Sequence, residues 1–286
     1  MTAARPMDFA GSWYPAGAET CRRAIAEFVA AAPHSPPAAP PLRLGVAPHA
    51  GWVFSGRLAA RAFHALAAGG PADLVIVLGG HLHPNDPPRA MTAGAWETPF
   101  GPFTVHTGFA PELRHFPGAL AETPADYVPD NSTELQLPFA RLMFPGAELL
   151  ALRVPPGPAA LRLAQVLADY LERTGLNAAA VASTDLTHYG PNYGFEPKGR
   201  GPAALRWVRE ENDPAFIRAL EGGGGQAVLD TARRGHCACS AGGVAVVAEL
   251  ARRRGLTFRP LGYATSADSP QGDTVNFVGY LAGMFA

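Results

Sequence analysis

Apolar runs alternate with amphipathic stretches along most of the chain. The apolar runs predict strands, which are expected at residues 42–47, 73–78, 148–154, 178–183, 257–264 and 275–281. Amphipathic periodicity predicts helices, which are expected at residues 19–32, 56–68, 159–172 and 240–254. Strands that are apolar on both faces are typical of a sheet buried between helices. The pattern therefore predicts an α/β fold with a mainly parallel or mixed central sheet covered by helices on both faces.

The length of 286 residues suits one large α/β domain, so a single domain is expected over residues 1–286. Residues 33–41 read Pro-His-Ser-Pro-Pro-Ala-Ala-Pro-Pro. Because this composition favours an extended chain, it predicts a Pro-rich linker between the first helix and the first strand.

The charge balance excludes several classes of partner. The chain has 23 Lys and Arg against 24 Asp and Glu, and no basic run is interleaved with aromatic residues, so nucleic acid is not an expected partner. No apolar run approaches the ~18 residues of a membrane span, and no signal pattern is present, so a cytoplasmic protein is expected. Three cysteines, an odd count, argue against a disulfide framework. The pattern carries no signature of a particular oligomeric state.

Histidines follow three of the expected strands. His49 comes after the first strand, His81 and His83 after the second, and Asp185 with His188 after the fourth. Ligands bind outside the carboxyl ends of parallel strands, where these side chains are expected to meet. The sequence therefore predicts one polar site at that edge of the sheet.

A cysteine is the fourth component of this expected site. Cys237 lies near the start of the last long helix, where the helix dipole favours a thiolate. Cys239 instead fits the usual role of a small buried apolar residue. Two histidines with one anionic ligand would make a metal site for Fe2+, with Cu and Zn as alternatives because thiolate is a soft ligand. Alternatively, Cys237 with a histidine and Asp185 would make a thiol hydrolase.

Motifs along nearly the whole chain resemble those of the Memo family, which is similar in fold to the class III extradiol ring-cleaving dioxygenases. The segments that carry the resemblance lie in the same order along this chain. They are Ala10-Gly11-Ser12-Trp13-Tyr14-Pro15, Ala47-Pro48-His49-Ala50-Gly51-Trp52, Gly94-Ala95-Trp96-Glu97-Thr98-Pro99, Asn131-Ser132-Thr133-Glu134, Ser183-Thr184-Asp185-Leu186-Thr187-His188-Tyr189-Gly190 and Thr265-Ser266-Ala267-Asp268.

The resemblance implies a metal held by His49, by a histidine after the second strand and by Cys237. It also implies that His188 occupies the acid/base position, with Asp185 close by. Aromatic residues of the matching segments are then expected to line the substrate pocket, namely Trp13, Tyr14 and Trp52.

The second histidine ligand depends on how this chain is aligned with the family. The family reads Gly-Pro-(Ser or Asn)-His after the second strand, whereas this chain reads Gly79-Gly80-His81-Leu82-His83. The distance onward to Thr98-Pro99 is one residue short, which favours a deletion and His81 as the ligand, with His83 as the alternative. Cys237 stands where the extradiol enzymes use a glutamate, and a thiolate donates more charge and is more easily oxidised.

The expected function is that of a mononuclear non-haem iron protein, a dioxygenase-like oxidoreductase that acts with O₂ on a small, aromatic substrate. One alternative is a metal-binding or adaptor protein without turnover. Another is a metal-dependent or Cys-dependent hydrolase.

Overall fold

The computed structural model describes residues 3–31, 41–222 and 224–286, so the expected linker, apart from Pro41, lies outside the described residues. Nine strands of the described part form one mixed sheet in the order β10-β12-β2-β9-β3-β8-β4-β7, with β11 paired to β12. These strands are β2 (Leu42–Ala47), β3 (Leu74–Gly79), β4 (Arg89–Met91), β7 (Leu120–Glu122), β8 (Glu148–Arg153), β9 (Ala178–Ser183), β10 (His188–Tyr189), β11 (Phe258–Thr265) and β12 (Phe277–Phe285). A smaller sheet joins β1 (Ala4–Arg5), β5 (Ala95–Trp96) and β6 (Phe103–Thr104).

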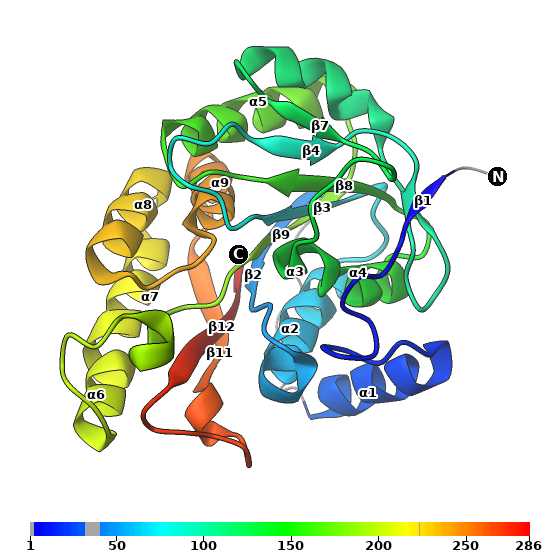
Figure 1. Cartoon of the computed structure of the whole chain (residues 1–286). Coiled ribbons are helices and arrows are strands. Elements are labelled where there is room, and N and C mark those ends of the chain that lie inside the picture. The colour runs from blue at the N-terminus through cyan, green and yellow to red at the C-terminus, as the bar shows by residue number, and fades with distance from the viewer. Residues whose placement is uncertain (1–2, 32–40, 223) are drawn as a thin grey trace.

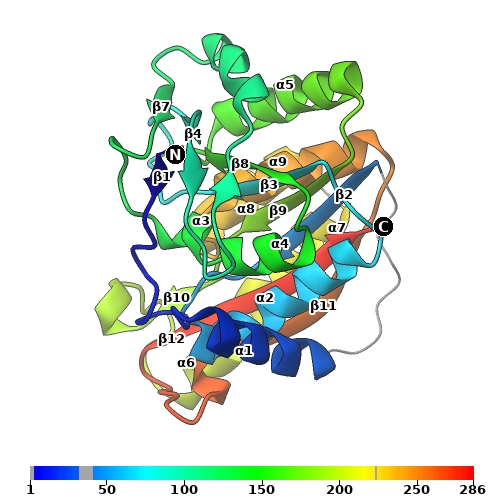
Figure 2. The ribbon, with the colours of Figure 1, turned by 90° about the vertical axis from the view of Figure 1, so that its right-hand side faces the viewer.

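Helices cover both faces of the large sheet, as the sequence predicts (Figures 1 and 2). On one face lie α1, α2 and α4, and on the other lie α5, α8 and α9. The described helices are α1 (Ala18–Ala30), α2 (Trp52–Ala67), α3 (Asn131–Glu134), α4 (Leu137–Met143), α5 (Pro158–Thr174), α6 (Pro202–Trp207), α7 (Asp213–Gly222), α8 (Gly224–Gly235) and α9 (Ala241–Arg253). Strand β3 divides its side chains between the two layers: Leu74, Ile76 and Leu78 pack on one face, and Val75 and Val77 on the other.

The four central strands, β2, β9, β3 and β8, run parallel. Their registers align the strand ends, because Ala47 of β2 pairs with Ser183 of β9, and Leu78 of β3 pairs with Ala182. The segments that leave these strands therefore begin at the same edge of the sheet, which is the geometry that brings a site together.

Helix α2 begins earlier than the sequence pattern predicts, at Trp52 and not at Gly56. In the sequence, Gly56 looks like the start of a helix. In the structure it lies inside α2, at a position where α1 and α2 approach closely. A Cβ added to Gly56 would lie 2.7 Å from Cε2 of Phe28 on α1. The earlier start places the first turn of α2 directly after His49.

A buried carboxylate, Asp213, supports the segment that carries His188. Asp213 is fully buried, and its Oδ1 accepts hydrogen bonds from the backbone N–H and the hydroxyl of Thr187. Its Oδ2 accepts a hydrogen bond from the Tyr263 hydroxyl at 2.8 Å. Burial is the main cause that raises the pKa of Asp213 from 3.8 to about 6, against the opposing effect of these hydrogen bonds.

This pKa predicts a specific dependence of stability on pH. Between pH 3.8 and about 6 the folded state binds more protons at Asp213 than the unfolded state, so the stability that Asp213 contributes falls as pH rises. The shift corresponds to about 3 kcal/mol. We expect the melting temperature of the wild type, relative to Asp213→Asn, to fall by roughly 5 °C between pH 4 and pH 7. Parallel pH profiles of the two proteins would contradict this assignment.

Candidate metal centre

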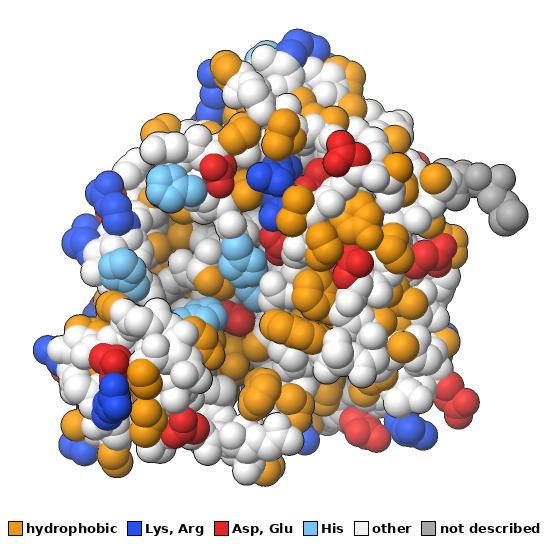
Figure 3. All heavy atoms as spheres, in the orientation of Figure 1, with side chains coloured by type: hydrophobic (Ala, Val, Ile, Leu, Met, Phe, Trp, Pro, Cys, Tyr) orange, Lys and Arg blue, Asp and Glu red, His pale blue; other side chains and the backbone are white. Residues whose placement is uncertain are grey.

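Three strand ends deliver the polar side chains of the candidate site. His49 follows β2, His81 follows β3 and Asp185 follows β9. The parallel pairing of these strands brings the three segments together, although they are far apart in the sequence. On the face of the molecule drawn in Figure 3, histidine side chains gather around a hollow near the middle.

His49 is held on several sides and is only 2% exposed. Its backbone N–H donates to Oδ1 of Asp185 at 2.7 Å, and its ring Nδ1 lies 3.1 Å from the Ser183 hydroxyl. The Ser183 hydroxyl also accepts a hydrogen bond from the Gln136 side chain at 2.9 Å. With Nδ1 engaged in this way, the lone pair of Nε2 is directed toward the other cluster residues.

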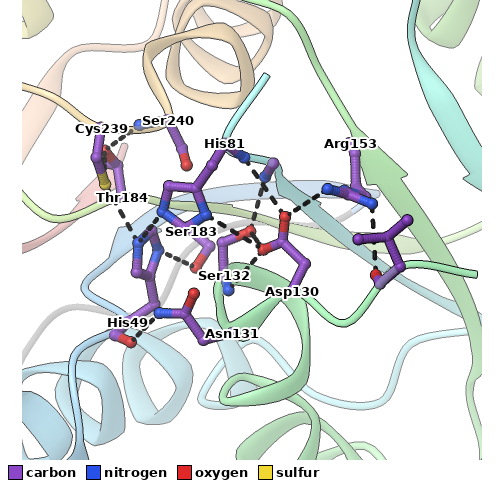
Figure 4. Close-up of polar contacts among 12 residues, drawn as sticks. His49, His81, Asp130, Asn131, Ser132, Arg153, Ser183, Thr184, Cys239 and Ser240 are labelled. Carbon is purple, nitrogen blue, oxygen red and sulfur yellow. Dashed lines mark hydrogen bonds and ion pairs between the residues drawn. The ribbon is translucent and has the colours of Figure 1, made fainter. Parts of the chain in front are cut away.

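His81 points at His49 and is backed by a carboxylate (Figure 4). The Nε2 atoms of His81 and His49 lie 3.2 Å apart, while Nδ1 of His81 lies 3.5 Å from Oδ1 of Asp130. Asp130 is fixed in turn by Arg153 at 2.9 Å, and it caps α3 through the backbone N–H of Ser132 at 2.9 Å. A carboxylate behind a histidine fixes the ring orientation and leaves Nε2 as the ligating atom.

His83, the alternative to His81, lies away from this cluster. It is exposed, and its backbone N–H donates to Oδ2 of Asp86 at 2.8 Å in a local turn. Of the two histidines after β3, only His81 lies beside His49 in the described structure.

The thiol at the cluster belongs to Cys239 and not to Cys237, which corrects the choice made from the sequence. The Sγ of Cys239 lies 3.2 Å from Nε2 of His49. Cys237 is fully buried in the core, and its thiol donates to the Thr231 carbonyl oxygen at 3.5 Å.

A chain reversal between α8 and α9 explains why Cys239, and not Cys237, lies at the cluster. His236 has a φ of 47°, so the chain turns sharply there. Before α9 begins, the backbone N–H of Cys239 donates to the carbonyl oxygen of Asp185 at 3.2 Å, which ties this residue to the end of β9. The backbone N–H of Cys237 instead bonds to the Ala232 carbonyl oxygen and so stays with the end of α8.

The three side chains shift one another's pKa values. Burial alone would raise the pKa of Cys239, but the two histidines hold it well below 9.0. The hydrogen bond to Asp130, followed by that to Cys239, raises the pKa of His81 to about 10. Burial lowers the pKa of His49, but Cys239 and Asp185 outweigh it and raise the pKa overall. The cluster thus favours a thiolate, the form of cysteine that ligates metals.

The donor set fits a single metal ion. Within residues 3–31, 41–222 and 224–286, His49, His81 and Cys239 offer three ligand atoms that lie within 4.8 Å of one another. The separations of 3.2 Å suit neighbouring ligands of one ion, since metal–nitrogen and metal–sulfur bonds are about 2.0–2.3 Å long. The Ser240 hydroxyl is also buried beside Cys239, with no hydrogen-bond partner among the described residues (Figure 4).

Comparison with known proteins identifies the family of this chain. The profile of the family described as Memo-like protein matches residues 5–284. The chain belongs to the Memo family. A MEMO1 family protein of Methanopyrus kandleri is 30% identical over 289 residues, covering 96% of each chain. A MEMO1 family protein of Aeropyrum pernix is 29% identical over 250 residues, covering 83% of this chain and 81% of the relative.

A solved structure, the uncharacterized protein JW3007 from Escherichia coli K12, is similar at a TM-score of 0.46 and 12% identity, covering 79% of this Memo-family chain and 91% of the other.

In the described part of the chain, no helix has both the length and the apolar character needed to cross a membrane.

In this Memo-family chain, His188 and Asp185 line the same cavity as His49 and His81. Nδ1 of His188 lies 3.1 Å from the Leu186 carbonyl oxygen, an obligate acceptor, so Nδ1 carries the proton and Nε2 is the basic atom. The ring packs edge-on against Tyr193. Asp185 is 3% exposed, and its burial is the main cause that raises its pKa.

A cavity of about 920 Å³ opens onto the cluster, and its wall includes His49, His81, Asp185 and His188. The three aromatic residues expected in the pocket also line it, but they differ in exposure. Trp13 is 40% exposed at the rim, whereas Tyr14 and Trp52 are almost fully buried and pack against each other. A second cavity of about 650 Å³ reaches Cys239 from another direction, and His188 and Tyr193 line both cavities.

Glu134 anchors the N-terminal part of this wall. Its two carboxylate oxygens accept hydrogen bonds from the backbone N–H groups of Asp8 at 3.0 Å and Phe9 at 2.7 Å. Oε1 also accepts from the Tyr14 hydroxyl at 3.0 Å. The segment that carries Trp13 is therefore fastened to α3, beside the residues that back the cluster.

Proposed function

We propose that this protein is a mononuclear non-haem metal protein that acts as an O₂-dependent, dioxygenase-like oxidoreductase on a small aromatic substrate. One observation carries the proposal: two imidazole Nε2 atoms and one thiolate converge next to a cavity large enough for an organic molecule. Membership of the Memo family supports the same site.

The proposed metal is iron(II), held by His49, His81 and Cys239. Two histidines and one anionic ligand on one side of an ion are typical of non-haem iron(II) oxygenases, and a thiolate also suits Cu or Zn. When bound, such an iron would supply the redox chemistry of the reaction with O₂. A dioxygenase reaction takes its electrons from the substrate itself, so no further reductant is needed.

The residues around the cluster have distinct proposed roles. Nε2 of His188 would take a proton from a substrate hydroxyl, because its Nδ1–H is committed to the Leu186 carbonyl. Asp185 would position His49, because its Oδ1 accepts the hydrogen bond from the His49 backbone N–H. Trp13, which is 40% exposed, would help to exclude water and stack on the substrate, with Tyr14 and Trp52 packed behind it.

The proposal is tested by metal analysis and O₂ consumption of protein purified under anaerobic conditions. We expect about one metal ion per chain in the wild type, and a loss of at least tenfold in metal content in His49→Ala and His81→Ala. His83→Ala is the matched control and is expected to keep the metal, because His83 lies in an exposed turn. Wild-type protein without bound metal would refute the proposal.

A second candidate, a thiol hydrolase, is favoured by one contact, the 3.2 Å approach of Cys239 Sγ to Nε2 of His49. The third group of such a site is weaker here, since Nδ1 of His49 meets the Ser183 hydroxyl and not a carboxylate. Turnover that persists without O₂ and after metal removal would favour the hydrolase. Tight metal binding without O₂ uptake on aromatic substrates would favour a non-catalytic metal-binding protein.

A further inference from the structure

The cavity above the cluster has chemically different ends. At one end lie the cluster histidines with Asp185, and at the other lie residues of α1 and α2, among them Phe28, Phe54 and Arg57. Among the described residues that line the cavity, Arg57 is the only lysine or arginine and Asp185 the only acidic residue. The fixed positive charge therefore belongs to the end that is remote from the proposed metal.

The position of Arg57 on α2 sets its separation from the cluster. His49 precedes the helix, which begins at Trp52, and Arg57 follows Trp52 by five positions. A rise of 1.5 Å per residue places Arg57 about 7–8 Å further along the helix axis. A molecule that reaches from the cluster histidines to Arg57 must therefore extend along the first turns of α2, past Val53 and Phe54.

The surface between the two ends is apolar. Val53 is 63% exposed and Phe54 is 37% exposed, and both line the cavity with Arg57. Residues spaced by three and four positions share a helix face, so Val53 and Phe54 adjoin Arg57. Trp13 at the rim and Phe28 on α1 continue this apolar wall.

The charge of Arg57 is not used inside the protein. Arg57 is exposed and makes no hydrogen bond or ion pair with any residue in the described ranges. Arg252, in contrast, is paired with Glu249 at 2.7 Å. A lone guanidinium above apolar and aromatic side chains is suited to an anionic ligand group, which it can bind in a bidentate manner.

We infer that the substrate of this site is an extended aromatic anion: a conjugated or multi-ring molecule with a metal-binding group at one end and a carboxylate, sulfonate or phosphate at the other. Arg57 would bind the anionic end and the Val53–Phe54 strip would contact the rings. The cavity volume of about 920 Å³ fits a ligand of this size. This inference rests on the proposed function, because it takes the cavity as the substrate pocket of the cluster.

Two fluorescent probes with one skeleton test the inference. The first, 8-anilinonaphthalene-1-sulfonate, has linked aromatic rings and one sulfonate, and the second, N-phenyl-1-naphthylamine, lacks the sulfonate. Both are titrated into metal-free and metal-loaded protein. We expect Arg57→Gln to weaken binding of the sulfonate about tenfold and to change binding of the neutral probe less than twofold. Arg57→Lys, which keeps the charge but not the bidentate guanidinium, is expected to bind the sulfonate with an affinity between those of the wild type and Arg57→Gln. Arg218→Gln, at an exposed arginine on α7, is expected to leave the affinity unchanged.

A further variant checks that the probes occupy this cavity. Phe54→Ala is expected to weaken both probes, because it removes part of the shared apolar wall. Unchanged sulfonate binding in Arg57→Gln, equal weakening of both probes in that variant, or no effect of Phe54→Ala would each overturn the inference. Probe binding does not require the metal, so absence of metal would refute the proposed function and leave this result intact.

Discussion

Cys239→Ser is expected to lose metal affinity on the order of 100-fold, whereas Cys237→Ser is expected to keep it within about twofold. The physical reason is position: Cys239 Sγ lies 3.2 Å from Nε2 of His49, and Cys237 Sγ donates to the Thr231 carbonyl oxygen in the core. Serine retains a hydroxyl but not the thiolate, so the first variant removes the anionic ligand alone.

The two variants make a matched pair, because the cysteines are two positions apart and receive the same substitution. Metal affinity is measured by competition with a chromophoric chelator, and folding by thermal melting. Cys237→Ser is expected to cost about 1–2 kcal/mol of stability, since it places a hydroxyl in an apolar core. Loss of the metal in Cys237→Ser with retention in Cys239→Ser would reverse the assignment of the thiol.

Asp130→Asn is expected to weaken metal binding by about 10–100-fold, although Asp130 is not a proposed ligand. Its carboxylate lies 3.5 Å from Nδ1 of His81 and is held by Arg153 at 2.9 Å. The amide cannot stabilise the Nδ1–H tautomer with a full negative charge, so Nε2 of His81 becomes a poorer donor. Loss of the ion pair to Arg153 is expected to cost about 2 kcal/mol of stability.

The variant Glu122→Gln distinguishes the effect of Asp130 on metal binding from its effect on stability. Glu122 also accepts a hydrogen bond from Arg153 at 2.9 Å but makes no hydrogen bond or ion pair with His81 in the described structure. We expect a similar loss of melting temperature in Glu122→Gln and a change in metal affinity of less than about twofold. Equal weakening of metal binding in both variants would show that Asp130 acts through stability and not through His81.

The strand framework and the strand-end histidines are predictable because their signals are local. The sequence predicts strand β9 at 178–183, and the structure has those bounds; its small apolar residues pair with strands on both sides. Parallel strands end at one edge, so the convergence of His49 and His81 follows from their positions after β2 and β3.

Proximity to the start of the last long helix, which favours Cys237 in the sequence, does not identify the thiol that lies at the cluster. The distinction between Cys237 and Cys239 depends on the reversal at His236, whose φ is 47°, and on the hydrogen bond from the Cys239 backbone N–H to the carbonyl oxygen of Asp185, which is distant in the sequence. One local signal did favour Cys239: it directly precedes Ser240, the N-cap of α9, so it lies nearer to the dipole of that helix.

The sequence pattern also fails to predict the role of Asp130 and the helices between residues 202 and 235. Asp130 reaches His81 across 49 positions of sequence, and nothing in the local pattern marks it as a partner. Glycines at the start of α8 (Gly224–Gly235) obscure this helix in the sequence pattern. Gly225 is buried there, where an added Cβ would lie 2.6 Å from the Ala245 carbonyl oxygen.

X-ray absorption at the metal edge tests the central claim most directly, because it reports the atoms bound to the ion. For protein loaded with iron(II) under anaerobic conditions, we expect one sulfur neighbour together with imidazole nitrogen neighbours. The sulfur contribution should vanish in Cys239→Ser and persist in Cys237→Ser. A wild-type spectrum without sulfur, or one that loses sulfur only in Cys237→Ser, would contradict a site built from His49, His81 and Cys239.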